Sequence, residues 1–180
     1  MKTANQIILY LIASLMLGGC ISSKPTTSYL LRPDDSAPRQ YANAVILDSV
    51  QLAGYLERPN PVVRSGKHKV DFTPCMVWAQ DFRSMIKETV ASNLLLRNAH
   101  LPNAKAFHAI VHFLRFEVDE NSGKLVVSVV CMMRCEKESL KKHFVYEYDC
   151  ASYNDERLID LYDKALSELA DKLCEMAESR

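Results

Sequence analysis

The chain has 180 residues, of which 22 are basic and 22 are acidic, and 48% are hydrophobic. A neutral chain of this composition excludes the usual nucleic-acid-binding protein, which needs a clustered basic surface. The length suits one domain with a sizeable core. Its six cysteines permit disulfide bonds only if the protein works in an oxidising compartment.

The first 20 residues have the pattern of an export signal. Lys2 precedes the apolar run Ile7–Leu17, which is too short for a transmembrane helix because a bilayer needs about 20 apolar residues. Gly18 and Gly19 then stand directly before Cys20, in the stretch LMLGGC. This stretch resembles the bacterial lipobox, and the resemblance implies cleavage after residue 19 and a diacylglycerol and N-acyl lipid on Cys20. The alternative is an ordinary secreted protein with a cysteine at this place by chance.

Removal of the signal peptide, residues 1–19, from the 180 residues leaves 161. Residues 20–28 are polar and contain Pro25, a composition that cannot bury itself, so we expect a flexible tether. One acyl chain anchors a protein marginally, whereas two or three hold it stably on a bilayer. We therefore expect a lipid-anchored domain, residues 29–180, that lies on a membrane without spanning it.

The first half of this domain predicts short strands and one helix. A short extended piece, Tyr29–Pro33, precedes a β-rich run at Val45–Leu52. Prolines at 59 and 61 then favour an edge or a turn, and Val62–Arg64 and Lys69–Phe72 predict a hairpin.

From Trp78 onward the apolar residues recur every three or four positions, which predicts an amphipathic helix. We expect it to begin at Thr73 or Pro74 and to end near Arg97 or Asn98, because Pro102 cannot continue it.

The second half predicts three antiparallel strands and a second helix. Ala106–Asp119 is apolar on both alternating faces, as expected for an interior strand. The turn ENSG leads to Leu125–Cys135 and then to Phe144–Cys150. Asn154 is expected to cap a long helix with an apolar stripe. The predicted fold class is therefore α/β, a single domain whose mixed, largely antiparallel sheet packs with two amphipathic helices.

The histidines and cysteines predict no metal site. His108 and His112 are four residues apart on a predicted strand, which separates them by about 13 Å at ~3.3 Å per residue. That separation is too long for one ion, and the same holds for the cysteines at 131 and 135.

A disulfide bond is one hypothesis for two of the cysteines. If Ser139–Lys142 forms the turn of the last hairpin, Cys131 lies opposite Cys150 and the two could be bonded.

The sequence contains no ordered catalytic motif and no nucleotide-binding loop. A dyad of Cys75 with His68 or His143 would make a thiol-dependent enzyme, but free cysteines are mostly small core residues. We therefore expect a non-catalytic binding or assembly protein without a cofactor.

Three stretches carry a resemblance to a known family: YLLRP, VQLAGYLERPNPVVR and VWAQDFRSMIKETVASNLL. In this order they resemble the landmarks of the PqiC/YmbA-type ABC-transport auxiliary lipoproteins, over Tyr29 to about Leu96. Gln80 and Asp81 depart from the family pattern, which has Glu and Pro at these places.

The resemblance implies an outer-membrane lipoprotein that faces the periplasm and serves an MCE-type lipid transport system. In such a system MCE subunits form a periplasmic conduit, and the auxiliary lipoprotein would dock that conduit at the outer membrane. Ile21 favours this placement, since an Asp after the lipidated cysteine typically implies retention at the inner membrane. Self-association is a further expectation, because a conduit with cyclic symmetry suits a repeating partner. The alternative function is a lipid-binding carrier with a cavity between sheet and helices.

The candidate partner-binding residues lie in the stretches that carry the resemblance, because aromatic, apolar and guanidinium groups are enriched in interface cores. These candidates are Tyr55, Leu56, Arg58, Pro59, Arg64 and Trp78. For Trp78 the competing interpretation is a core anchor of the first helix.

Overall fold

The computed structural model describes residues 25–34, 36, 39–98, 105–136, 138–150 and 154–179. Cys20 and the predicted signal peptide, residues 1–19, lie outside the described residues. Within these ranges no helix is both long enough and apolar enough to cross a membrane. The elements are β1 (Thr27–Tyr29), β2 (Ala44–Leu52), the 3₁₀ helix η1 (Gly54–Leu56), β3 (Val62–Arg64), β4 (Val70–Phe72), β5 (Met76–Trp78), α2 (Phe82–Arg97), β6 (Ala106–Asp119), β7 (Lys124–Cys135), β8 (Glu138–Asp149) and α3 (Asp155–Glu178).

The main sheet has six strands in the order β4, β3, β6, β7, β8, with β2 also paired to β6. The predicted antiparallel meander is confirmed as β6, β7 and β8, and the predicted hairpin as β3 and β4. Gly123 closes the turn between β6 and β7 with a φ of 63°, a conformation that glycine adopts without strain. The predicted fold class, a single α/β domain with a mixed sheet and two helices, is confirmed.

Strand β6 organises the sheet because two different strands share one of its edges. The strand β2 runs parallel to its first half, from Ala106 to Phe113, and β3 runs parallel to its last residues, from Glu117 to Asp119. Between the two, the register with β7 shifts around Leu114, as at a β-bulge. The edge of β6 therefore has a gap between β2 and β3.

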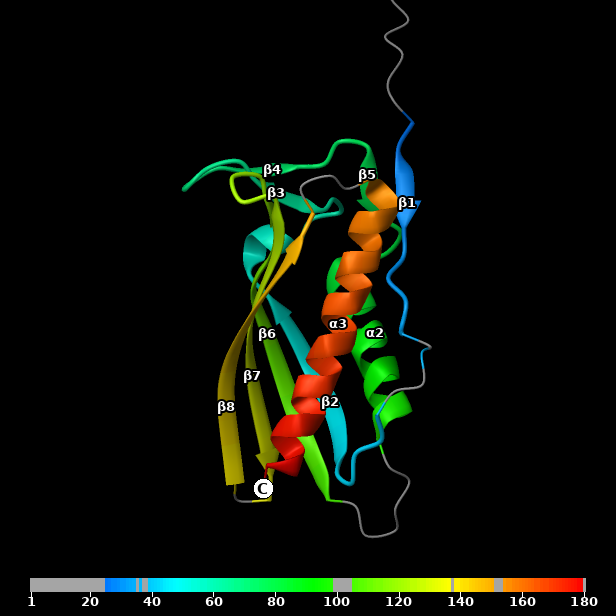
Figure 1. Ribbon diagram of the computed structural model, residues 1–180, viewed down its shortest axis with the longest axis vertical. Coiled ribbons are helices and arrows are strands. Elements are labelled where there is room, and N and C mark those ends of the chain that lie inside the picture. The colour runs from blue at the N-terminus through cyan, green and yellow to red at the C-terminus, as the bar shows by residue number, and fades with distance from the viewer. Residues whose placement is uncertain are drawn as a thin grey trace, which may run out of the picture.

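Both helices lie on one side of the sheet (Figure 1). A side chain caps the N-terminus of each helix. The Asp81 side chain accepts a hydrogen bond from the N–H of Ser84, and the Asn154 side chain accepts one from the N–H of Arg157. The predicted end of the first helix at Arg97 is confirmed. Its predicted start is wrong, because the residues after Pro74 form β5 and the helix begins only at Phe82.

Strand β5 pairs in parallel with β1 and is not part of the helix. Thr27 pairs with Met76, and Tyr29 pairs with Trp78. Strand β1 thus includes Thr27 and Ser28, which the sequence assigns to the tether. The pairing fixes the start of the described chain beside the N-terminal end of α3 (Figure 1).

Aromatic side chains fill the core between the sheet and the N-terminal ends of the two helices. Trp78 stacks on Phe82 with ring centroids 4.6 Å apart, and Phe116 stacks on Tyr162 at 4.4 Å. Phe113 extends the stack along β6. All five rings are buried, so they join β5, α2, β6 and α3 into one core.

A buried arginine joins the two helices to the segment before β2. The guanidinium of Arg97 donates two hydrogen bonds to the Asp171 carboxylate, at 2.8 and 3.1 Å, and one to Ser167 Oγ at 2.8 Å. Ser167 in turn donates to Asp34, and Tyr41 donates to Asp171. Burial disfavours the charge on Arg97, but the bonds to Asp171 outweigh it and raise the pKa of the guanidinium.

Replacement of Asp171 tests this arrangement. We expect Asp171→Ala to lower the free energy of unfolding by about 3 kcal/mol, because it leaves the buried guanidinium of Arg97 without its counter-charge. Urea unfolding monitored by circular dichroism measures the loss. The neighbouring control, Lys172→Ala, removes only the exposed pair with Glu175 and should cost less than about 0.5 kcal/mol. Equal effects of the two changes would contradict the role of the buried pair.

Candidate interaction surface

The segment after β2 fills the gap along the edge of β6. The N–H of Ala53 donates to the carbonyl of Phe113 at 2.9 Å, and the hydroxyl of Tyr55 donates to the carbonyl of Leu114 at 3.0 Å. Leu56 enters the core and is 1% exposed. Ala53 and Tyr55 therefore satisfy carbonyls of β6 between the ends of β2 and β3.

A fully buried carboxylate lies under this segment. Glu117 on β6 accepts hydrogen bonds from Arg64 at 2.5 and 3.2 Å and from Arg115 at 2.7 Å. Burial would raise the pKa of Glu117, but the hydrogen bonds from Arg64 and Arg115 lower it below its ordinary value. The carboxylate is therefore ionised at neutral pH, and through Arg64 it fixes β3 against β6.

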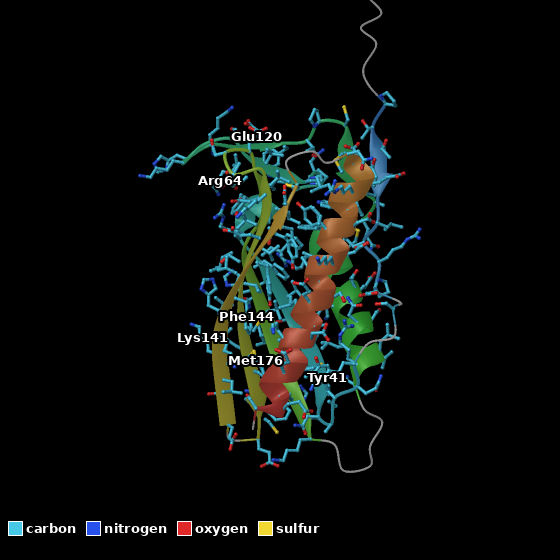
Figure 2. The ribbon with its side chains drawn as sticks, viewed as in Figure 1. Tyr41, Arg64, Glu120, Lys141, Phe144 and Met176 are labelled. Carbon is cyan, nitrogen blue, oxygen red and sulfur yellow. The ribbon has the colours of Figure 1, made fainter. Side chains whose placement is uncertain are left out.

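Exposed groups lie next to this buried centre. Arg58 and Pro59 are exposed, and the guanidinium of Arg58 lies 5.9 Å from the centroid of the Phe72 ring, which is itself exposed. The carbonyl of Pro59 accepts from the N–H of Trp78 at 2.7 Å, so the loop is attached to β5. We call these residues the 55–72 surface: Tyr55, Arg58, Pro59, Arg64 and Phe72. Figure 2 labels Arg64 at the end of the molecule that carries β3 and β4.

The structure places four of the six predicted partner-binding residues on this surface. The other two, Leu56 and Trp78, are core residues with 1% and 5% exposure, and Trp78 meets the Tyr162 ring edge-on. Their burial leaves almost no surface for a partner. These two residues therefore pack the core, and the prediction that they contact a partner directly is corrected. The sequence did not indicate Phe72 or Glu117, since only the pairing of β3 with β4 and β6 brings them to Arg58 and Arg64.

The predicted disulfide between Cys131 and Cys150 is wrong. Cys135 pairs with Glu138, so the hairpin turns directly after Cys135 and not at Ser139–Lys142. Glu136 makes this turn possible with a φ of 50°. Cys131 therefore faces Lys142, and both cysteines are free.

Two histidines of the sheet are engaged with local partners. His108 lies on β6, as predicted, and its Nδ1 is 2.8 Å from Asp48. His143 on β8 is 2.8 Å from Ser128 through Nε2. In the part of the chain that the structure describes, no three histidine, cysteine or acidic side chains are grouped to hold a metal ion.

The buried thiols are not suited to nucleophilic chemistry. Burial raises the pKa of both Cys131 and Cys174 to about 12, so almost none of either is thiolate at neutral pH. Burial also raises the pKa of Cys150.

Comparison with known proteins adds the family. The sequence matches the family model described as the ABC-type transport auxiliary lipoprotein component over residues 29–174. The chain belongs to this family. It is therefore related to lipoproteins that assist ABC-type transporters, which is a role in transport at the cell envelope.

Solved structures share the fold of this auxiliary lipoprotein. One, titled as an uncharacterized protein, has a TM-score of 0.66 and 13% identity and covers 85% of this chain and 99% of its own. Another, a DUF330 protein from Xanthomonas campestris, has a TM-score of 0.62 and 16% identity and covers 82% of this chain and 92% of its own. The comparison with curated proteins found no match.

The buried carboxylate of Glu117 gives a pH-dependent prediction. Because its pKa is lowered on folding, its contribution to stability is complete above the ordinary value of 4.5 and is lost as the pH falls through the folded pKa. We expect Glu117→Gln to lose about 2 kcal/mol at pH 7 and to show less acid sensitivity below pH 4.5 than the unchanged protein. Urea unfolding at a series of pH values measures both. The exposed Glu120→Gln should match the unchanged protein, and a Glu117→Gln profile equal to it would contradict the role of Glu117.

Alkylation tests the state of the thiols. We expect N-ethylmaleimide to modify the half-buried Cys75 and Cys135 in the folded protein, and to modify Cys131, Cys150 and Cys174 only after unfolding in urea. Peptide mass spectrometry identifies each site. A bond between Cys131 and Cys150 would instead protect this pair in urea until a reductant is added.

Proposed function

We propose that this lipoprotein is a non-catalytic, outer-membrane-anchored component of an MCE-type lipid transport system, and that it docks the periplasmic conduit at that membrane. The observation that carries the proposal is the position of the 55–72 surface. Strands β3, β4 and β5 lie at the same end of the molecule as β1, where the described chain begins (Figure 1). The surface is therefore at the end nearest to the proposed anchor on Cys20.

Covalent geometry supports this placement. Only four residues, 21–24, separate Cys20 from Pro25, the first described residue. At about 3.5 Å per residue, the chain from Cys20 to Pro25 spans at most roughly 18 Å. Since β1 is paired with β5, the anchor would hold this end of the domain close to the bilayer, and a partner bound there would end at the membrane.

The chemistry of the 55–72 surface suits protein binding. Arginine and aromatic side chains are the residues that most often dominate binding energy at interfaces. Arg58 and Phe72 are exposed beside a rigid base, because Glu117 holds Arg64 and the Tyr55 hydroxyl is bonded to β6. A surface that is already ordered loses little conformational entropy when it binds.

A lipid-binding carrier is the second candidate function. A cavity of about 400 Å³ opens near the ends of β6, β7 and β8, and its lining joins the apolar Ile110, Met132 and Leu140 with charged side chains that include Lys141. The lining residues come from strands β2, β6, β7 and β8 and not from the helices, so this is not the cavity between sheet and helices that was expected from the sequence. This volume lies in the range of small-molecule sites. Native mass spectrometry that finds phospholipid on the gently purified protein would favour this function.

The anchor is tested by Cys20→Ser. Without the thiol no diacylglycerol can be attached, so we expect the protein to leave the membrane fraction and to appear in the soluble periplasmic fraction. Fractionation and the mass of the unchanged mature protein measure this. A Cys20→Ser protein that stays with the outer membrane would contradict lipid anchoring through this residue.

Docking is tested by the double change Arg58→Ala and Phe72→Ala. We expect at least tenfold weaker capture of a purified MCE-domain subunit, equivalent to about 1.4 kcal/mol, because both exposed anchors are lost. The control Lys87→Ala removes an exposed cation from α2, away from this surface, and should bind like the unchanged protein. Undiminished capture by the double variant would contradict docking through the 55–72 surface.

A further inference from the structure

Strand β8 forms a long edge of the main sheet. It has 12 residues, and β7 is its one described strand partner. In Figure 1 it lies at the outer edge of the sheet, on the side away from the two helices. Natural proteins usually shorten or interrupt such edges because an unpaired strand invites another one.

The direction of the backbone groups along β8 follows from one hydrogen bond. The N–H of Cys150 donates to the carbonyl of Gly123 at 2.9 Å, in register with the pairing of Lys124 and Asp149. In an antiparallel ladder the N–H and C=O of one residue point to the same side, and successive residues alternate. Even-numbered residues of β8 therefore bond to β7, and odd-numbered residues from Ser139 to Asp149 present their N–H and C=O at the edge.

The side chains of β8 have a charge order along the strand. Glu138 begins the strand, Lys141 and Lys142 follow in its first half, and Glu147 and Asp149 lie in its second half. Between them Val145 is 56% exposed. If two such strands pair in parallel, like charges face each other. If they pair antiparallel, lysines face acidic residues.

We propose that two copies of this chain join by antiparallel pairing of β8 with β8, about a two-fold axis between the two Phe144 residues. In this register Lys141 of one copy lies opposite Glu147 of the other, and His143 lies opposite Val145. All these residues are odd-numbered, so each facing pair can exchange two backbone hydrogen bonds. The sheet becomes continuous through both copies, with the helices of both on the same face.

The alternative registers are less favourable. If the register of the two β8 strands shifts by one residue pair in one direction, Lys141 faces Val145 and no opposite charges within β8 meet. If the register shifts in the other direction, Lys141 faces Asp149, but the paired stretch shortens from residues 139–149 to residues 141–149. The assigned register keeps the longer pairing and places Glu147, which already contacts Lys124 at 2.6 Å, between two cations.

The occupant assigned to this edge is a second copy rather than an unrelated strand. The pattern is self-complementary about Phe144, which a two-fold interface requires because each surface meets itself. This inference rests on β8 and not on the transport role. Because the pairing is antiparallel, the β1 ends of the two copies lie at opposite ends of the dimer, so the dimer would lie with its strands along the bilayer for both Cys20 anchors to reach it (Figures 1 and 2).

The first test is Val145→Pro in the full chain, purified in detergent. Proline removes an N–H that points to the free edge, so it blocks pairing between copies without removing a hydrogen bond to β7. Sedimentation equilibrium should give twice the chain mass for the unchanged protein and one chain mass for the variant at the same concentration. A single-chain mass for the unchanged protein at all concentrations up to about 100 μM, or an undiminished dimer for a folded variant, would overturn the proposal.

The second test exchanges charges. Lys141→Glu should weaken the dimer about tenfold because the introduced carboxylate would face Glu147 twice, and the added change Glu147→Lys should restore it. Asp149→Lys added to Lys141→Glu in place of Glu147→Lys should not restore the dimer. If it does, the assigned register is wrong. The control Lys87→Glu alters the same charge on α2 and should leave the dimer unchanged. Circular dichroism and urea unfolding check that each variant is folded.

Discussion

The buried carboxylate of Glu117 is the constraint on which the arrangement of the candidate surface depends. A lone charge with no exposure would be strongly destabilising, so the fold must provide cations at this position. Arg115 comes from the same strand, but Arg64 comes from β3, more than fifty residues earlier in the chain. Satisfaction of this carboxylate therefore selects the pairing of β3 with the end of β6, and with it the position of the loop that carries Arg58.

The gap between β2 and β3 explains why this loop is ordered. Two strands cannot continue into each other along β6, because η1 and the prolines at 59 and 61 stand between them. The carbonyls of Phe113 and Leu114 would be unsatisfied there, and Ala53 and Tyr55 supply the missing donors. The irregular segment is thus fixed in place, since its contacts through Ala53 and Tyr55 complete the sheet. The pair of Arg97 and Asp171 has the same effect at the other end of α2, where it joins the helices to the segment before β2.

Sequence patterns predicted elements well where the signal was local. The long helix capped by Asn154, the strands β2, β6 and β7, and the end of α2 at Arg97 all follow from periodicity and capping within a few residues. The turn of the last hairpin was placed too late in the chain because it has no glycine to mark it; Glu136 adopts a positive φ instead. The start of α2 was misplaced because β5 exists only through its pairing with β1, some fifty residues away.

The sequence by itself determined the class of fold, the two helices, the strand character of the histidine segment and the family to which the chain belongs, because these depend on short-range patterns and ordered motifs. The tertiary structure decided which residues of the motif are accessible. It buried Leu56 and Trp78, brought Phe72 to Arg58, and separated Cys131 from Cys150. The physical reason is that exposure and facing partners depend on strand register, and register is fixed by long-range pairing and by the compensation of buried charge.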